Sequence, residues 1–316
     1  SPPEATRFRI AERLRSHPPG RGPPTVALPT MRFPTTWIVL TWAAATLAPA
    51  AASAAPPPLA AEAYRVAAQV ASQIGPRPST SVGEGRALDL AEARFRAAGL
   101  AVLRDPFDVP RRGRSSNVVG RYGSSTGCLK ILVAHADSVT IAPGANDNGS
   151  GLGLLVGLAD RLRELRPRCE IWLVATGSEE RGVTGTIDHL GASQLVARVR
   201  ARGVGSRVRY VLSLDDFGFG SRFWLRSPQR RPRRAVEGQV LRIARRAGVR
   251  LVWARDDSQG NSDHREPELA GIPGMVFQSW RGEDACRHQP CDTADRLQQP
   301  AFTLAARVVE GVVRTG

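Results

Sequence analysis

The chain has 316 residues, with 44 Lys or Arg against 29 Asp or Glu, and therefore a formal net charge of +15. Almost all of this positive charge is arginine, since Lys130 is the only lysine. Proteins that bind single-stranded nucleic acid interleave aromatic with basic residues, and the basic runs here lack that pattern, so we expect no nucleic-acid partner. The densest run, residues 226–234, contains two prolines and predicts an exposed loop.

The first 54 residues are predicted to lie outside the folded domain. Residues 1–30 are rich in Pro and Arg without periodicity, and we interpret them as an upstream or disordered extension. A charged start at Met31, an apolar run at 36–47 and small residues ending at Ala54 predict a signal peptide at 31–54. The alternative is a short N-terminal membrane anchor. With a cleaved signal we expect a secreted or periplasmic protein without stable membrane association.

Residues 55–316 have the length of one sizeable α/β domain. Apolar residues at helical spacing alternate with short apolar runs that read as strands. In chain order the predicted elements are helices 59–74 and 84–98, strands 101–109, 116–121 and 131–134, helix 150–165, strand 171–175, helix 190–201, strands 210–214 and 223–225, helix 234–247, strand 275–277 and helix 300–313. This alternation, without an internal repeat, predicts a three-layer α/β/α sandwich with a mostly parallel central sheet.

Four cysteines in an exported chain favour disulfide bonds. Cys286 and Cys291 flank His288 closely enough to close a small loop, which would stiffen the segment that carries the histidine. Cys128 and Cys169 each begin a strand-like run and would pair only if those strands are neighbours. Spacing does not decide that second connectivity.

Two acidic or histidine motifs follow the first buried strand. His135 would lie at the carboxyl end of strand 131–134, and a carboxylate two residues later, Asp137, can orient an imidazole that binds a metal. Asp147 lies in the sequence PGANDNGSG, where it or Ser150 would cap the next helix. The three glycines around Asp147 favour instead a backbone bent to bring this carboxylate against a bulky group such as a metal.

Further candidate metal ligands follow the next two strands, and one more occurs late in the chain. Glu179 and Glu180 end a buried strand, which favours one metal ligand and one general base over two partners of a helix dipole. Asp215 ends strand 210–214, and strand alternation turns Asp216 to the other face. His288 completes two sites of three protein ligands each, provided that Asp147 bridges them. Mixed histidine and carboxylate ligands fit catalytic zinc.

The segments HADS, PGANDNGSG, GSEERG, SLDDFG, NSDH…GIP and CRHQPCD resemble the M28 zinc aminopeptidases, and the resemblance covers residues 60–313. The family includes secreted bacterial leucyl aminopeptidases. The resemblance implies a mixed central sheet, a cis peptide after Asp147 and a Cys286–Cys291 disulfide. It implies two zinc ions with the following roles: His135 and Asp215 on one zinc, Glu180 and His288 on the other, Asp147 as the bridge and Glu179 as the general base.

The implied reaction removes the N-terminal residue of peptides that carry a free α-amino group. Two metals about 3.5–4 Å apart would hold a bridging water, whose proton Glu179 would pass to the leaving amine. Arg287 stands where the family often has Tyr, and it is either an oxyanion donor or points away from the site. Pro267 replaces a usual Phe, so side-chain preference does not carry over. We treat Asp263 and His264 as structural support, and we expect a monomer.

Two other classes fit parts of the same pattern. Glutaminyl cyclases have this fold and use a single zinc for intramolecular cyclisation, so the metal stoichiometry separates them from a two-metal hydrolase. Non-catalytic relatives with decayed metal sites are disfavoured because every ligand type is present here.

Overall fold

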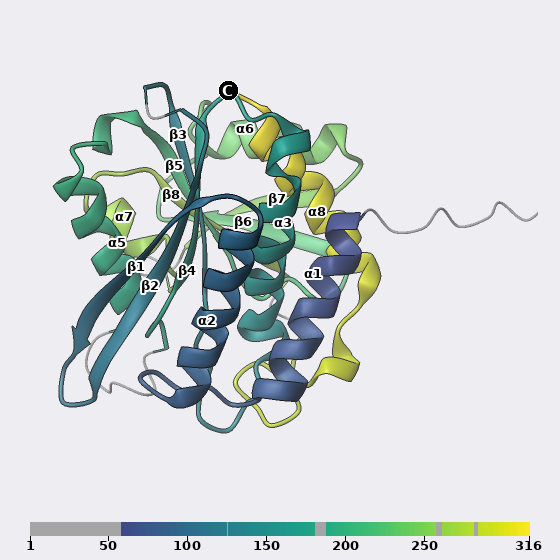
Figure 1. Cartoon of the computed structure of the whole chain (residues 1–316). Helices are drawn as coiled ribbons and strands as arrows, with labels where there is room; N and C mark the ends of the chain where they lie inside the picture. The colour runs from purple at the N-terminus through teal and green to yellow at the C-terminus, as the bar shows by residue number, and fades with distance from the viewer. Residues whose placement is uncertain (1–57, 125, 181–187, 257–260, 281–283) are drawn as a thin grey trace, which may run out of the picture. The chain divides into compact units, whose positions relative to one another are not determined.

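A computed structural model describes residues 58–124, 126–180, 188–256, 261–280 and 284–316 (Figure 1). The predicted extension at 1–30 and the predicted signal peptide at 31–54 lie outside these described residues. Within the described ranges, no helix has the length and apolar character needed to cross a membrane.

One eight-stranded sheet forms the centre of the domain, in the order β1-β2-β4-β3-β5-β8-β6-β7. Neighbours from β4 through β3 and β5 to β8 are parallel, whereas β1, β2 and β6 add antiparallel pairs. The mixed sheet that the family resemblance implied is therefore confirmed. The strands are β1 (Ala101–Val109), β2 (Gly113–Tyr122), β3 (Leu129–His135), β4 (Glu170–Thr176), β5 (Val208–Leu214), β6 (Arg222–Ser227), β7 (Arg250–Arg255) and β8 (Gly274–Ser279).

Helices cover both faces of this sheet, which confirms the three-layer architecture (Figure 1). One face packs against α1, α2, α3, α6 and α8, and the other packs against α5, with α7 beside it. The helices are α1 (Pro58–Gln69), α2 (Val82–Ala97), α3 (Gly151–Leu165), α5 (Leu190–Ala201), α6 (Glu237–Arg246), α7 (Arg265–Leu269) and α8 (Gln299–Arg314). A five-residue π-helical turn, Val70–Ile74, continues α1.

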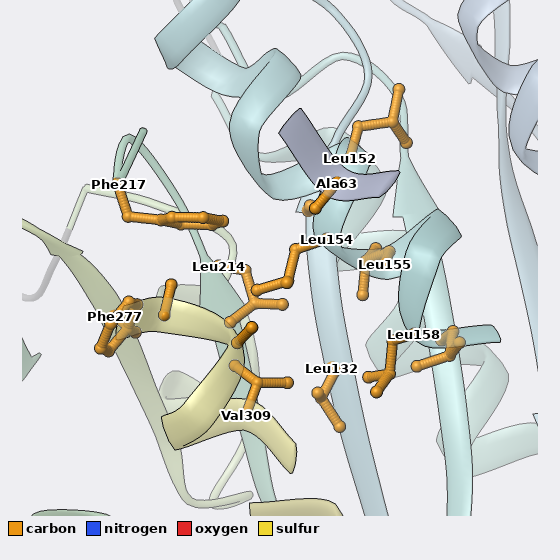
Figure 2. Packing of buried hydrophobic residues seen from close by; sticks show 14 of the residues in the cluster. Ala63, Leu132, Leu152, Leu154, Leu155, Leu158, Leu214, Phe217, Phe277 and Val309 are labelled. Carbon is orange, nitrogen blue, oxygen red and sulfur yellow. The ribbon is translucent and has the colours of Figure 1, made fainter. Parts of the chain in front are cut away.

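Alternation along the central strands explains how one sheet supports two cores. In β3, Leu132 faces the larger core while Ile131 and Val133 face the smaller one. Figure 2 shows Leu154 of α3 lying beside Leu214 of β5 in the larger core. The helices and strands of both cores thus hold the carboxyl ends of β3, β4 and β5 in fixed relative positions.

Every predicted element is present with its ends shifted by three residues or fewer, the π-helical turn counted with α1. Among the described residues, one strand and one α-helix were missed for physical reasons, besides the short π- and 3₁₀-helical turns. The edge strand β7 has no fully buried run, because its residues alternate between exposed and half-buried. The short helix α7 has only five residues and contains Pro267, so it shows no helical periodicity.

The prediction that residues 226–234 form an exposed loop is wrong at the first two of them, which belong to β6 and are buried. The Nε atom of Arg226 lies 2.8 Å from Asp256 Oδ1. Arg233 donates to Glu237 and lies 2.9 Å from Glu268. The acidic partners come from later segments, so no local pattern in this run predicts that they pack against it.

Candidate metal centre

The six predicted site residues meet at the carboxyl ends of β3, β4 and β5. His135 is the last residue of β3, Glu179 and Glu180 follow β4, and Asp215 follows β5. Asp147 lies in the turn Ala145–Ser150, directly before α3. His288 comes from the loop between β8 and α8 and is the most exposed of the six, with 36% of its side chain accessible. The parallel strands therefore bring together residues that are far apart in the chain.

Asp147 belongs to two groups of candidate metal ligands, one with His135 and Asp215 and the other with Glu180 and His288. It presents one carboxylate oxygen to each group. Its Oδ1 lies 3.3 Å from His135 Nε2, which is also 3.5 Å from Asp215 Oδ1. Its Oδ2 lies 3.1 Å from His288 Nε2, which is also 3.2 Å from Glu180 Oε2. In each group the three ligand atoms lie within 4.8 Å of one another. A third such group, His135 with Glu179 and Glu180, overlaps the other two.

Several polar atoms of these groups lack hydrogen-bond partners within the described part of the protein, and a metal ion could bind them. Among the described residues, several of these buried atoms have no hydrogen-bond partner: Asp147 Oδ1 and Oδ2, Glu180 Oε1, Asp215 Oδ1 and His288 Nε2. Buried carboxylates without partners are costly, because burial removes the hydration of each charge. Cations among them would remove that cost, and a donor set of imidazole nitrogens and carboxylate oxygens suits zinc.

Asp137 supports the site differently from its predicted role. Its carboxylate accepts the backbone N–H groups of Glu179 and Glu180, each at 3.0 Å. His135 Nδ1 lies 3.1 Å from the backbone oxygen of Asp137 but 3.7 Å from its carboxylate. The imidazole is thus oriented mainly by a carbonyl, while the Asp137 side chain fixes the two glutamates. Burial raises the pKa of Asp137.

Arg287 points toward the site, so the alternative that it points away is wrong. Its Nε atom lies 3.1 Å from Asp147 Oδ2 and 3.5 Å from Asp216 Oδ2. Burial lowers the pKa of this guanidinium, but the charge of Asp147 and its neighbours outweighs burial and raises it. Asp216 is buried, accepts a hydrogen bond from the Asn146 amide and lies outside the three ligand groups.

Three supporting residues were missed by the sequence reasoning. Arg77 is fully buried and donates to the backbone oxygens of Gly75, Ala136, Pro143 and Gly144 at 2.5–3.3 Å. Asp292 accepts the N–H groups of Asn146 at 2.8 Å and Asp147 at 3.0 Å. His189 lies with its Nε2 atom 3.3 Å from Glu179 Oε1. Only Asp292 had a sequence signal, since it stands four residues after His288.

Both cysteine pairs form disulfides. The Cys286–Cys291 bridge closes the loop that carries His288, as the resemblance implied. Cys128 and Cys169 are also bonded, because each directly precedes one of the neighbouring strands β3 and β4. The peptide bond between Asp147 and Asn148 is cis, which confirms another implication of the resemblance.

Asp292→Asn is expected to weaken metal binding because an amide offers one acceptor oxygen where the carboxylate uses two. The turn that carries Asp147 would lose one of two anchoring hydrogen bonds. Losing such a supporting contact typically weakens metal affinity about 10–100-fold. Competition with a chromophoric chelator measures this affinity. Asp295→Asn, at an exposed position nearby, is the matched control, and equal affinity in both variants would contradict the role of Asp292.

Comparison with known proteins gives a family match and several relatives. The model of peptidase family M28 matches residues 117–313. The uncharacterised Escherichia coli protein YfbL is 28% identical over 277 residues, which cover 76% of this chain and 82% of YfbL. Aminopeptidase YwaD of Bacillus subtilis is 42% identical over 207 residues, covering 58% of this chain. The match spans only 41% of YwaD.

Solved structures share the fold at low sequence identity. A zinc aminopeptidase from Bacillus subtilis superposes with a TM-score of 0.71 at 17% identity, covering 82% of this chain and 95% of that structure. A glutaminyl cyclase from Bacteroides thetaiotaomicron gives 0.72 at 19% identity, covering 83% of this chain and all of that structure (100%). The fold alone therefore does not separate hydrolysis from cyclisation.

Proposed function

Because the chain belongs to peptidase family M28, we propose that it is a two-zinc aminopeptidase that hydrolyses the N-terminal bond of peptides. The observation that carries this proposal is the position of Asp147, whose two carboxylate oxygens face two separate His and carboxylate groups. A carboxylate with one oxygen toward each group can bridge a pair of metals. We assign one zinc to His135, Asp147 and Asp215, and the other to Asp147, Glu180 and His288.

Glu179 is the proposed general base. When bound, the two ions supply Lewis acidity that activates a water molecule and polarises the scissile carbonyl. Glu179 accepts the proton of the attacking water and delivers it to the leaving amine. Two features support this role: its backbone N–H is held by Asp137, and its two oxygens face His135 and His189 at 3.9 Å and 3.3 Å.

Arg287 is the proposed donor to the developing oxyanion. It lies beside Asp147 with 26% of its side chain exposed, so a substrate that enters the site can reach it. A fixed cation at the point where negative charge develops stabilises the transition state of acyl transfer. Arg287 would thus fill the role that Tyr has in the family.

The charge of the site supports a substrate with a free α-amino group. Glu179 is assigned to neither zinc, so its carboxylate is the group at the site that a cationic α-amino terminus can meet, and an internal peptide bond offers no such charge. The two disulfides support an exported protein. We propose residues 31–54 as the signal peptide and residues 55–316 as the peptidase domain, active as a monomer.

A single-zinc glutaminyl cyclase is the second candidate, because a cyclase has the same fold at equal similarity. The zinc content separates the two functions. We expect about two zinc ions per chain by elemental analysis, since two complete ligand groups are present. One zinc per chain, together with cyclisation of an N-terminal glutamine, would favour the cyclase.

The proposed function is tested with aminoacyl anilides and N-terminally blocked peptides, with and without chelator. We expect release of the N-terminal residue from free substrates only, loss of activity with chelator and recovery with zinc. Cleavage of the blocked peptides at internal bonds would overturn the exopeptidase assignment. Full activity in chelator, with zinc shown to be absent, would overturn the metal mechanism.

A further inference from the structure

The two carboxylate oxygens of Glu179 face two different histidines. Its Oε2 atom lies 3.9 Å from Nε2 of His135, a member of the metal groups. Its Oε1 atom lies 3.3 Å from Nε2 of His189, which comes from a separate part of the chain, directly before α5. Oε2 therefore faces the metal groups, whereas Oε1 is contacted by His189.

His189 is held firmly in this place. Only 3% of its side chain is exposed, and its backbone N–H donates to the backbone oxygen of Glu179 at 3.0 Å. The next residue, Leu190, donates to the backbone oxygen of Ser178 at 3.0 Å, so the start of α5 is tied directly to the segment that carries the base. The φ angle of His189 is +55°, a left-handed value that residues other than glycine seldom adopt.

A second carboxylate lies on the far side of the imidazole. His189 Nδ1 is 3.6 Å from Glu266 Oε1 and has no hydrogen-bond partner among the described residues. Glu266 is itself held at 2.6 Å by Arg265, in the short helix α7. Asp188 Oδ1 also lies 3.9 Å from Nδ1, so carboxylates face both nitrogens of the imidazole. Such an imidazole directs an N–H to each side more readily than one in an apolar pocket.

We propose that His189 is a positioning residue, which donates from Nε2 to Oε1 of Glu179 and so turns Oε2 toward the attacking water. Glu266 supports the imidazole from its other nitrogen. This inference rests on the proposed peptidase reaction and adds a requirement to it. The base must be oriented by a histidine that lies outside the metal ligands.

The test compares His189→Leu with His189→Gln in the zinc-loaded enzyme. Leu fills the space but has no donor, whereas the Gln amide can still donate to Glu179. Loss of a hydrogen bond to a charged group corresponds to about a 10–100-fold fall in rate, so we expect that fall in kcat for His189→Leu. KM and zinc content should change by less than about twofold, because the metal ligands are untouched. His189→Gln should recover most of the loss.

Glu266→Gln extends the test to the far side of the imidazole. It should lower kcat less than His189→Leu does, and it should cause no further loss in the His189→Leu background, because Glu266 acts through His189. Additive losses in the double variant would overturn the Glu266 part of the proposal.

His264→Gln is the matched control. His264 is also buried and pairs with a carboxylate, Asp256, at 2.6 Å. We expect it to lower Tm but to leave kcat within about twofold, as for loss of a structural contact. The inference is overturned if His189→Leu keeps wild-type kcat, if His189→Gln is as slow as His189→Leu, or if His264→Gln lowers kcat equally. A wild-type enzyme that cleaves no peptide would instead overturn the proposed function.

Discussion

Glu179→Ala is expected to lower kcat by several orders of magnitude while the fold and the zinc content stay unchanged. The side chain is buried beside the metal groups, and its removal deletes the carboxylate that would move the proton from water to the leaving amine. General base catalysis alone raises a reaction rate about 10²–10⁴-fold, and a misplaced water would lower kcat further. Steady-state kinetics with an aminoacyl anilide, together with elemental analysis, measures both quantities.

Glu180→Ala is the matched control, because Glu180 is the adjacent glutamate and is equally buried, with 4% exposure against 5%. It should lose zinc, whereas Glu179→Ala should keep it. This contrast matters because Glu179 and Glu180 also share a ligand group with His135. If Glu179→Ala loses zinc and Glu180→Ala keeps it, the two roles are exchanged. If Glu179→Ala keeps both zinc and near-wild-type activity, the base assignment is wrong.

Most of the site residues that could be predicted from the sequence lie at the end of a strand or just after it. His135, Glu179 and Asp215 each follow an apolar run, and the carboxyl ends of parallel strands meet at one edge of a sheet. The periodicity of the chain therefore predicts both the sheet and the position of these side chains. His288 follows no such strand closely, and it was included because it completes two sites of three ligands each.

The supporting residues could not be predicted because their roles depend on distances between remote segments. Arg77 lies between two helices in sequence, yet it donates to Ala136 and Gly144, which are 59 and 67 residues further along the chain. The pattern around His189 predicts only the start of a helix, and nothing in the local sequence shows that His189 contacts Glu179. The Cys128–Cys169 bond likewise depends on β3 and β4 being neighbours, which their spacing does not determine.

Two arginines balance the negative charge of the site from different sides. Arg77 is fully buried behind the loops that carry Asp137 and Asp147, whereas Arg287 lies beside Asp147 and is partly exposed. Burial lowers the pKa of Arg77 to about 10, and the carboxylates of Asp137 and Asp292 oppose that shift. Arg77 is still charged at neutral pH, so its cation offsets part of the repulsion among the buried acids.

Arg77→Leu is expected to lower the free energy of unfolding by about 3–5 kcal/mol, the range for removal of one partner from a buried charged network. Leucine leaves the oxygens of Ala136, Pro143 and Gly144 buried without this donor, and it leaves the nearby carboxylates without the cation.

Chemical denaturation with intact disulfides measures this loss. Arg86→Leu, at an exposed position of α2, is the control and should change stability by less than about 0.5 kcal/mol. Because Arg77 ties the loop after β3 to the turn that carries Asp147, zinc affinity should fall together with stability. An Arg77→Leu protein that keeps wild-type stability and zinc affinity would show that other contacts hold these loops and that the buried cation is dispensable.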